Sequence, residues 1–368
     1  MSWPDFWTHN TWQTKLLSPL AKLVCWEASR RLQQFQQQPP LRQTSASVIV
    51  VGNIVVGGSG KTPFIVWLTK QLQSKSLRVG IISRGYGGNS KHWPLLVTAG
   101  SDPKLVGDEP VLLAKQLGCL IAVSPKRPQA IELLNQQADL DVIISDDGLQ
   151  HYAMARDIEV VLIDAQRQFG NQRCLPAGPL REPMSRLNQV DFCIWNGLSS
   201  AQEFPSLPLT PLDANSNKQP GHFKMNLSPL CFRQVMNPSE TRSVEAFANQ
   251  AVYAIAGIGN PQRFFETLQD LHVLTTSQAF ADHYAYRLAD FEGFEDEKPL
   301  LMTEKDAVKC SLIAQTHQKT NWWYLEVAPI CDTGEDDLFT QILHRLQRLK
   351  PDFDGTQSIR ATSPKKEN

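Results

Sequence analysis

An alternation of two hydrophobic patterns constrains the fold of this chain more than any other feature. Between residues 47 and 197, short apolar runs alternate with segments whose apolar residues recur at three- and four-residue steps. The predicted strands are 47–53, 78–85, 119–124, 141–148, 158–164 and 190–197, and the predicted helices are 62–73, 108–118 and 127–137. Strands that alternate with helices indicate an α/β fold with a parallel, helix-covered sheet.

The length of 368 residues favours more than one domain. The rhythm breaks near residue 198, where Pro, Ser and Asn become frequent, and a second α/β pattern begins near residue 250. We therefore predict five segments: an N-terminal amphipathic segment (1–40), a nucleotide-binding and catalytic domain (41–200), a linker or hairpin (201–248), a smaller α/β domain (249–335), and a C-terminal helix with a disordered tail (336–368).

Charge and cysteine usage exclude several classes of protein. Lys plus Arg (36) nearly balances Asp plus Glu (37), so the sequence offers no overall basic surface for nucleic acid. The seven cysteines include no C-x-x-C pair, which argues against a zinc cluster and a disulfide framework and suits a reducing cytosol. The N-terminus does not resemble a secretory signal, and no run of about 18 apolar residues predicts a membrane span.

The segment 12–35 is predicted to form an amphipathic helix. One helical face collects apolar residues at three- and four-residue steps: Trp12, Leu16, Leu20, Leu23, Val24, Ala28, Leu32 and Phe35. Basic charge comes from Lys15, Lys22, Arg30 and Arg31. The pattern alone is compatible with two roles, since such a helix can pack on its own domain or lie in a membrane interface.

The segment 51–62, "VGNIVVGGSGKT", predicts a phosphate-binding loop between a strand and a helix. In such a loop the glycines let backbone N–H groups converge on phosphate oxygens, the lysine reaches the β/γ-phosphates, and a Ser/Thr hydroxyl binds Mg²⁺. The usual pattern has a glycine where this chain has Val55, but the rest is present: Gly57, Gly58, Ser59, Gly60, Lys61 and Thr62.

A second motif agrees with the loop. The segment 141–151, "DVIISDDGLQH", is an apolar strand that ends in Asp146 and Asp147, the usual position of a carboxylate that holds Mg²⁺. Carboxylates next to a glycine also occur in plain turns. Because both motifs occur in the expected order, we predict a P-loop NTPase fold.

Two further polar clusters follow predicted strands. "SRGYGG" (83–88) includes Tyr86, and "VGDEP" (106–110) places Asp108 and Glu109 at the start of a helix. Acidic residues there can serve as helix caps. Loops after parallel strands also face the ligand crevice, where a carboxylate can take a proton from an acceptor hydroxyl.

The ordered set of motifs resembles the tetraacyldisaccharide 4′-kinase family, the lipid A 4′-kinases of Gram-negative bacteria. The matching segments are "VGNIVVGGSGKTP", "SRGYGG", "VGDEP", "DDGLQH", "LPAGPLREP", "AGIGNPQRFF", "DHYAY" and "TEKDAVK", in order from about residue 46 to 310. The family's loop also lacks the first glycine, so Val55 fits. Two departures are Ser59 in place of Thr and Tyr284 after His283.

The resemblance implies the following site. Asp108 would be the catalytic base for the 4′-hydroxyl, His283 its partner, and Lys61 the binder of the transferred phosphate. Glu109, Asp146, Asp147 and Thr62 would surround Mg²⁺. Contacts on the substrate or phosphate side would come from Tyr86, Arg127, Gln150, His151 and Arg181. ATP and Mg²⁺ would be the cofactors, and the site would lie in a cleft between domains.

The resemblance also implies an acylated disaccharide 1-phosphate as acceptor, which is held in a membrane. It favours the interfacial role for the helix at 12–35, with peripheral attachment to an anionic surface at the cytoplasmic face of the bacterial inner membrane. The alternative is a ParA- or MinD-type ATPase switch. Its deviant loop has a lysine where this chain has Val56. Nucleic acid is not an expected partner.

Overall fold

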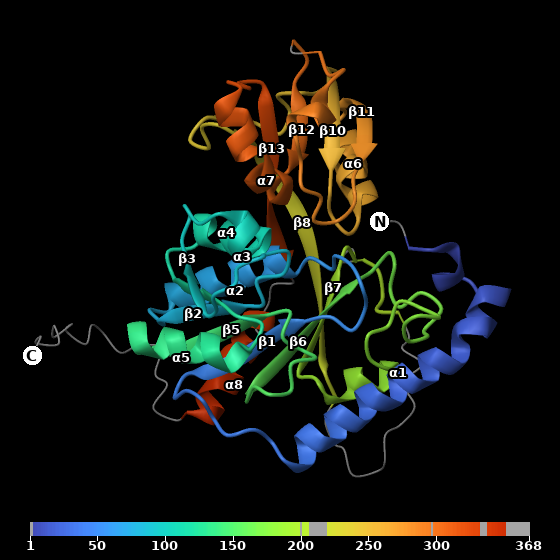
Figure 1. The fold of residues 1–368 in the computed structure, drawn as a ribbon, viewed down its shortest axis with the longest axis vertical. Helices are drawn as coiled ribbons and strands as arrows, with labels where there is room; N and C mark the ends of the chain where they lie inside the picture. Colours follow the sequence, from blue (N-terminus) through green and yellow to red (C-terminus); the bar gives the residue numbers. More distant parts are fainter. Residues whose placement is uncertain (1–2, 199–200, 206–218, 296, 332–336, 351–368) are drawn as a thin grey trace, which may run out of the picture.

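A parallel sheet forms the larger lobe of the molecule (Figure 1). The computed structural model describes residues 3–198, 201–205, 219–295, 297–331 and 337–350. The parallel strands of this lobe are β1 (Ser47–Gly52), β2 (Val79–Ser83), β4 (Leu120–Val123), β5 (Val142–Asp146), β6 (Ile158–Asp164) and β7 (Phe192–Asn196). The short β3 (Leu95–Val97) pairs antiparallel with β4 at the edge. All six predicted strands are confirmed.

Helices cover both faces of this sheet, which explains why its strands are apolar throughout. Alternate residues of β1 point to opposite faces: Ile49 and Val51 join one core, and Val48 and Val50 join the other. The first core is covered by α2 (Lys61–Ser74), α4 (Asp108–Gln116) and α8 (Leu338–Leu349), and the second by α5 (Arg127–Gln137). The short α3 (Pro103–Val106) precedes α4, and the 3₁₀ helix η2 (Met184–Gln189) precedes β7.

The smaller lobe continues the same sheet. It contains β10 (Ala251–Ala256), α6 (Pro261–Asp270), β11 (Leu274–Ala279), η3 (Leu288–Phe291), β12 (Leu300–Thr303), α7 (Glu304–Thr316) and β13 (Trp322–Cys331). The long strand β8 (Gly221–Gln234) pairs parallel with β7 and antiparallel with β13, while the short β9 (Thr241–Arg242) pairs with β8. The full order is β11-β10-β12-β13-β8-β7-β6-β1-β5-β2-β4-β3. Figure 1 shows β8 and β13 passing between the lobes.

The α/β fold class is confirmed, but the segment predicted as a linker or hairpin contains the 14-residue strand β8. The sequence obscures β8 because its buried residues form two separate pairs, at 223 and 225 and at 232 and 234. The stretch between the pairs has no buried residue and includes Asn226, Ser228 and Pro229. The C-terminal helix packs on the larger lobe, although it follows the smaller lobe in the sequence. Its residues Leu338, Ile342 and Leu346 are part of the core of the larger lobe. Residues 206–218 of the linker and the predicted disordered tail beyond residue 350 lie outside the described residues.

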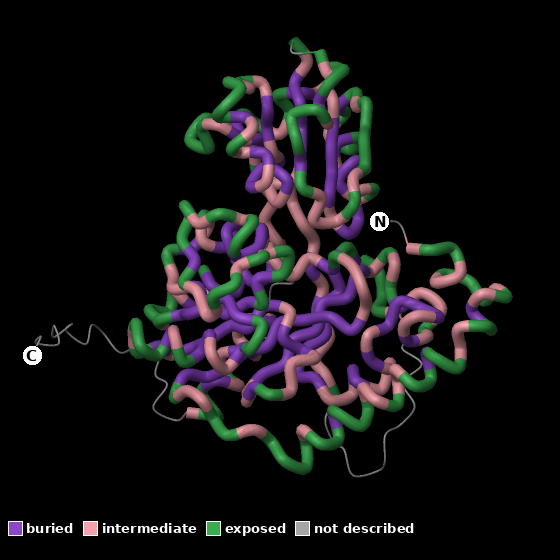
Figure 2. The backbone as a smooth tube through the Cα atoms, viewed as in Figure 1, coloured by how far each residue is buried: buried purple, intermediate pink, exposed green. Residues whose placement is uncertain are grey.

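The helix predicted at 12–35 is confirmed as α1 (Trp12–Gln37), which follows the 3₁₀ helix η1 (Asp5–Trp7). Its apolar residues divide between two sides. Ala21 and Leu32 are buried against the larger lobe, and Leu17, Val24 and Cys25 pack beside them. An exposed stripe consists of Trp12, Leu16, Leu20, Leu23 and Trp26. Figure 2 shows α1 exposed along its outer side. No helix within the described residues has the length and apolarity needed to cross a bilayer.

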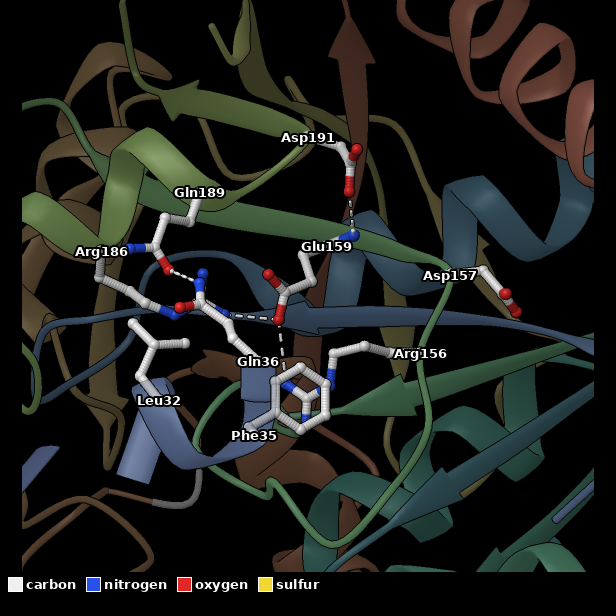
Figure 3. Close-up of a pocket in the computed structure, with 9 residues that line it drawn as sticks. All are labelled: Leu32, Phe35, Gln36, Arg156, Asp157, Glu159, Arg186, Gln189 and Asp191. Atoms are coloured by element: carbon white, nitrogen blue, oxygen red, sulfur yellow. Dashed lines mark hydrogen bonds and ion pairs between the residues drawn. The ribbon is translucent and has the colours of Figure 1, made fainter. Parts of the chain in front are cut away.

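The last turns of α1 cover a cavity of about 190 Å³, drawn in Figure 3. Leu32 and Phe35 line one side, and the ion-paired Arg156, Glu159 and Arg186 line the other. None of the predicted site residues lines this cavity. One residue of its polar lining contacts a predicted site residue: Arg156 donates to the backbone oxygen of His151, and also to that of Leu149.

A disulfide corrects one expectation from the sequence. Cys25 of α1 is disulfide-bonded to Cys174. The two partners are 149 residues apart, and no local spacing marks them as a pair. The bond ties α1 to the loop between β6 and β7, which also carries Arg181.

Candidate active site

The phosphate loop is held by amide side chains from two strand ends. Asn53, directly after β1, donates from Nδ2 to the oxygens of Gly57 (3.1 Å) and Ser59 (3.3 Å), and Asn196 at the end of β7 donates to the Ser59 backbone oxygen (3.1 Å). Gly60 has φ +89°, and a Cβ there would lie 2.3 Å from Asn196 Nδ2. Only glycine fits this position. Helix α2 starts at Lys61 and places Thr62 in its first turn.

Two positively charged side chains form ion pairs with Asp147 beside the phosphate loop. Its carboxylate lies 3.4 Å from Lys61 Nζ and 3.0 Å from Arg181 Nη1. Burial would raise the pKa of Asp147, but the charges of Lys61 and Arg181 outweigh it and hold this pKa well below its ordinary range. The backbone of Asp147 has φ +47°, a strained conformation for a residue other than glycine. The predicted Lys61, Asp147 and Arg181 are thus brought together.

Asp146, at the end of β5, lies in a different environment. Ser83 at the end of the neighbouring β2 donates to its Oδ2 (3.0 Å), and its buried Oδ1 has no hydrogen-bond partner among the described residues. Burial, and then the negative charges of Glu109 and Asp147, raise the pKa of Asp146 to about 7. A buried carboxylate oxygen without a donor is an oxygen ligand available to a cation.

The residues present fit a magnesium ion bound together with phosphates. No group of three or more His, Cys, Asp or Glu side chains within the described residues could hold a metal ion by itself. That arrangement agrees with Mg²⁺, which is usually bound through one or two carboxylates and completes its shell with water and substrate phosphates. Asp146 supplies its Oδ1 oxygen, and Thr62 and Glu109 lie in the first turns of α2 and α4, at the same end of the sheet.

Asp108 and His283 meet across the two lobes. Asp108 is the first residue of α4, and His283 lies in the loop after β11, with its Nδ1 3.1 Å and 3.2 Å from the carboxylate oxygens of Asp108. Burial would raise the pKa of Asp108, but the hydrogen bond from His283 and the charge of Lys305 outweigh it and lower this pKa to about 2. His283 has φ +58°.

Tyr86 lies beside this pair. Its exposed ring contacts the His283 ring at a centroid distance of 4.8 Å. The loop that carries Tyr86 reaches the start of α4 because Gly107 has φ +94° and leaves room for the Tyr86 backbone oxygen, which would lie 2.5 Å from a Cβ at that position. The "SRGYGG" and "VGDEP" motifs therefore form one surface.

The other predicted contacts lie beneath the carboxylates. Arg127 is buried, and its guanidinium donates to the backbone oxygens of Asp146 (3.0 Å) and Ser124 (3.2 Å). His151 Nε2 accepts from the Arg127 backbone N–H, and burial together with the Arg127 charge lowers the pKa of His151 to about 4. Gln150 donates to Glu182 (2.8 Å). In this conformation Arg127, Gln150 and His151 support the loop after β5.

Several residues that contact the site were not predicted from the sequence. Asn53, Asn196, Glu182 and Asp282 each hold a predicted residue or the phosphate loop. Lys305 joins both lobes, with Nζ 3.0 Å from Glu109 Oε1. Four of these residues lie within the motifs "VGNIVVGGSGKTP", "LPAGPLREP", "DHYAY" and "TEKDAVK", and that position was the available signal for Asn53, Glu182, Asp282 and Lys305. Asn196 lies outside these motifs, at the end of the predicted strand 190–197.

Comparison with known proteins decides the family. The family described as tetraacyldisaccharide-1-P 4′-kinase, LpxK, matches residues 13–347. The chain belongs to this family. The tetraacyldisaccharide 4′-kinase of Hydrogenovibrio crunogenus is 53% identical over 94% of this chain and 98% of its own length, and that of Pasteurella multocida is 48% identical over 88% and 93%.

A solved LpxK structure also has this fold. The crystal structure described as the "apo" form of Aquifex aeolicus LpxK in complex with ATP matches with a TM-score of 0.72 and 26% identity, covering 91% of this chain and 99% of that one. The resemblance and the α/β fold predicted from the sequence are confirmed, and a ParA- or MinD-type switch is not favoured.

Proposed function

We propose that the protein transfers the γ-phosphate of ATP to the 4′-hydroxyl of a tetraacyldisaccharide 1-phosphate, a step of lipid A synthesis. One observation carries the proposal: the Asp108–His283 pair of the two lobes lies at the same edge of the sheet as the phosphate loop and Asp146. An acceptor hydroxyl and a triphosphate can therefore meet there. The family match and the ATP named for the Aquifex aeolicus structure support the choice of reaction.

In the proposed mechanism, Asp108 accepts the proton of the 4′-hydroxyl. A pKa of about 2 keeps this carboxylate ionised, and the hydrogen bond to His283 orients it. The acceptor oxygen forms a bond to the γ-phosphorus, and the bond from that phosphorus to the β–γ bridging oxygen breaks. ADP leaves with the electron pair of that bond.

The phosphate loop and its cations position and neutralise the transferred group. Lys61 and Arg181 both form ion pairs with Asp147, so both positive charges would lie close to a phosphate bound in the loop. Phosphoryl transfer depends mainly on such positioning and charge stabilisation. Asp146, Asp147, Glu109 and Thr62 would hold Mg²⁺, which when bound offsets charge on the phosphate oxygens.

For the finer contacts, Tyr86 is proposed to contact the acceptor because it is exposed beside His283. Arg127, Gln150 and His151 are proposed to act on the substrate side through the loop that they support.

The acceptor carries acyl chains, so we also propose that the protein works at an anionic membrane surface. The exposed stripe of α1 and its basic residues support attachment of this kind. The attachment would be peripheral, at the cytoplasmic face of the inner membrane.

Product analysis tests the proposed reaction. Purified full-length protein is incubated with Mg²⁺, γ-labelled ATP and a tetraacyldisaccharide 1-phosphate, and the lipid is examined by mass spectrometry. We expect ATP turnover that requires the lipid and adds one phosphate to its 4′-oxygen. ATP hydrolysis that ignores the lipid and leaves it unmodified would refute the proposal and favour a switch ATPase.

A further inference from the structure

The segment 303–309, "TEKDAVK", has a lysine whose role the proposed mechanism leaves open. Helix α7 begins in this segment. Thr303 accepts from the backbone N–H of Asp306, and the fully buried Asp306 accepts from the backbone N–H of Gly257 and pairs with Lys309 at 2.8 Å. These bonds fix the first turn of α7 within the smaller lobe. Lys305 lies on that turn and is directed toward the larger lobe.

The ammonium of Lys305 lies among four polar side chains. Its Nζ is 3.0 Å from Glu109 Oε1, 3.4 Å from Asp282 Oδ1 and 3.4 Å from His283 Nε2, and it is 3.9 Å from Asp108 Oδ2. An ammonium has three N–H donors and no acceptor. The three nearest groups use all of them, and only 15% of the side chain is exposed.

This arrangement determines which nitrogen of His283 carries its proton. Because Lys305 can only donate, Nε2 of His283 must present a lone pair to it. The ring proton is then on Nδ1, which donates to Asp108 at 3.1 Å. With the other tautomer, an Nε2–H would lie nearer to the Lys305 ammonium (3.4 Å) than to the Asp282 carboxylate (3.8 Å), and the Nδ1 lone pair would face the Asp108 carboxylate.

We propose that Lys305 is a positioning residue for phosphoryl transfer: it selects the His283 tautomer that donates to Asp108 and joins Glu109 to the smaller lobe. The inference rests on the roles proposed above for Asp108 and His283. Lys305 acts through these side chains and does not itself take or give a proton. The same ammonium orients the base and connects the two lobes that carry the site.

Nitrogen-15 NMR of the imidazole rings tests the tautomer without any substrate. Full-length protein is labelled at its eight histidines, and His283→Gln assigns the His283 signals. We expect the wild type to show a protonated Nδ1 and an unprotonated Nε2. Lys305→Met should shift the population toward Nε2–H, while Lys305→Arg, again a pure donor, should keep the wild-type pattern. An unchanged tautomer in Lys305→Met would overturn the proposal.

Kinetics separates this role from simple stabilisation of the fold. Lys309→Met is the matched control, because Lys309 is also an ion-paired lysine of α7 but lies outside the His283 cluster. Lys305→Met should lower kcat by about 10- to 100-fold with the KM for ATP changed by less than about threefold, and Lys305→Arg should recover most of the loss. Equal losses of kcat in the two Met variants would contradict the proposal.

The assay of lipid phosphorylation and the NMR comparison of tautomers test separate claims. If the wild-type protein does not phosphorylate the lipid disaccharide, the proposed function is wrong, while the tautomer comparison still decides whether Lys305 orients His283.

Discussion

At the scale of single residues, environment separates three neighbouring carboxylates. Asp108 is held ionised by His283 and Lys305, and Asp147 by Lys61 and Arg181. Asp146 is buried, which raises its pKa to about 7, and its Oδ1 has no hydrogen-bond partner in the part of the chain that the structure describes. Groups whose pKa values are pushed apart commonly have separate roles in catalysis. Here the ionised Asp108 suits proton acceptance, and the free oxygen of Asp146 suits a metal.

The role of Asp108 gives the first prediction. Asp108→Asn keeps the shape but removes a proton acceptor, so kcat should fall by roughly 10²–10⁴-fold while ATP binding changes little. Steady-state kinetics with the lipid acceptor and calorimetry with ATP measure the two effects. Asp102→Asn is the control, since Asp102 caps α3 and asparagine also caps helices. Weakened ATP binding with unchanged kcat would instead assign Asp108 to nucleotide or metal binding.

Local sequence patterns indicated candidate site residues that lie in contiguous motifs, but they did not indicate contacts between residues far apart in the sequence. The phosphate loop and Asp146–Asp147 are contiguous with their strands, so spacing alone indicated them. Lys305 could not be predicted in this way, because its partner Glu109 is 196 residues away. The pairing of Cys25 with Cys174 also depends on the folded chain.

At the scale of elements, the exact packing of α1 was the least predictable feature. The sequence indicated one broad apolar face, but the structure buries Ala21 and Leu32 and leaves Leu16, Leu20 and Leu23 in solvent. The same periodicity therefore combines a packed side and an exposed stripe. Such a division depends on which neighbours the helix contacts, and residue spacing does not specify these.

The exposed stripe predicts binding to lipid. Four basic residues and one acidic residue, Glu27, leave α1 with a net charge of +3, and each basic residue near an anionic surface contributes about 1 kcal/mol. Replacing Leu16, Leu20 and Leu23 with Ser should reduce sedimentation with anionic vesicles. It should also lower activity on bilayer-held acceptor more than on detergent-dispersed acceptor, and high salt should weaken binding of the parent.

Three equally exposed leucines provide the control for that variant. Leu230, Leu274 and Leu312 are 52%, 59% and 68% exposed, compared with 54% to 68% for the three leucines replaced in α1, and they lie outside α1. Their replacement with Ser should leave vesicle binding unchanged. If the α1 variant remains folded and binds vesicles like its parent, membrane contact depends on another surface.

At the scale of the whole molecule, the contact between the lobes should respond to pH. Gln116 of α4 donates to Glu304 of α7, and burial raises the pKa of Glu304 from 4.5 to about 7. A carboxyl group with a raised folded-state pKa stabilises the fold when protonated, and this contribution is lost as pH rises from about 4.5 through about 7. The loss is at most about 3 kcal/mol.

Thermal or denaturant unfolding between pH 5 and about 8 measures this effect. Glu304→Gln should remove part of the fall in stability, because the amide does not ionise. Glu295→Gln is the control, since Glu295 is exposed and paired with Lys298. If Glu304→Gln follows the same pH dependence as the parent, Glu304 does not couple protonation to the lobe contact.

A close approach of two glycines gives the final prediction about the whole molecule. The loop after β10 places Gly259 directly against the phosphate loop, where a Cβ on Gly259 would lie 2.3 Å from the Gly58 backbone nitrogen. Two backbones cannot yield locally to such a clash, so Gly259→Ala should push the smaller lobe away from the loop. Because Asp108 and His283 belong to different lobes, kcat should fall by about tenfold or more. Gly100→Ala, where a Cβ would have no neighbouring atom of the described residues within 4 Å, should keep normal kcat. A Gly259→Ala enzyme with parental kcat would mean that turnover does not require the lobes to approach this closely.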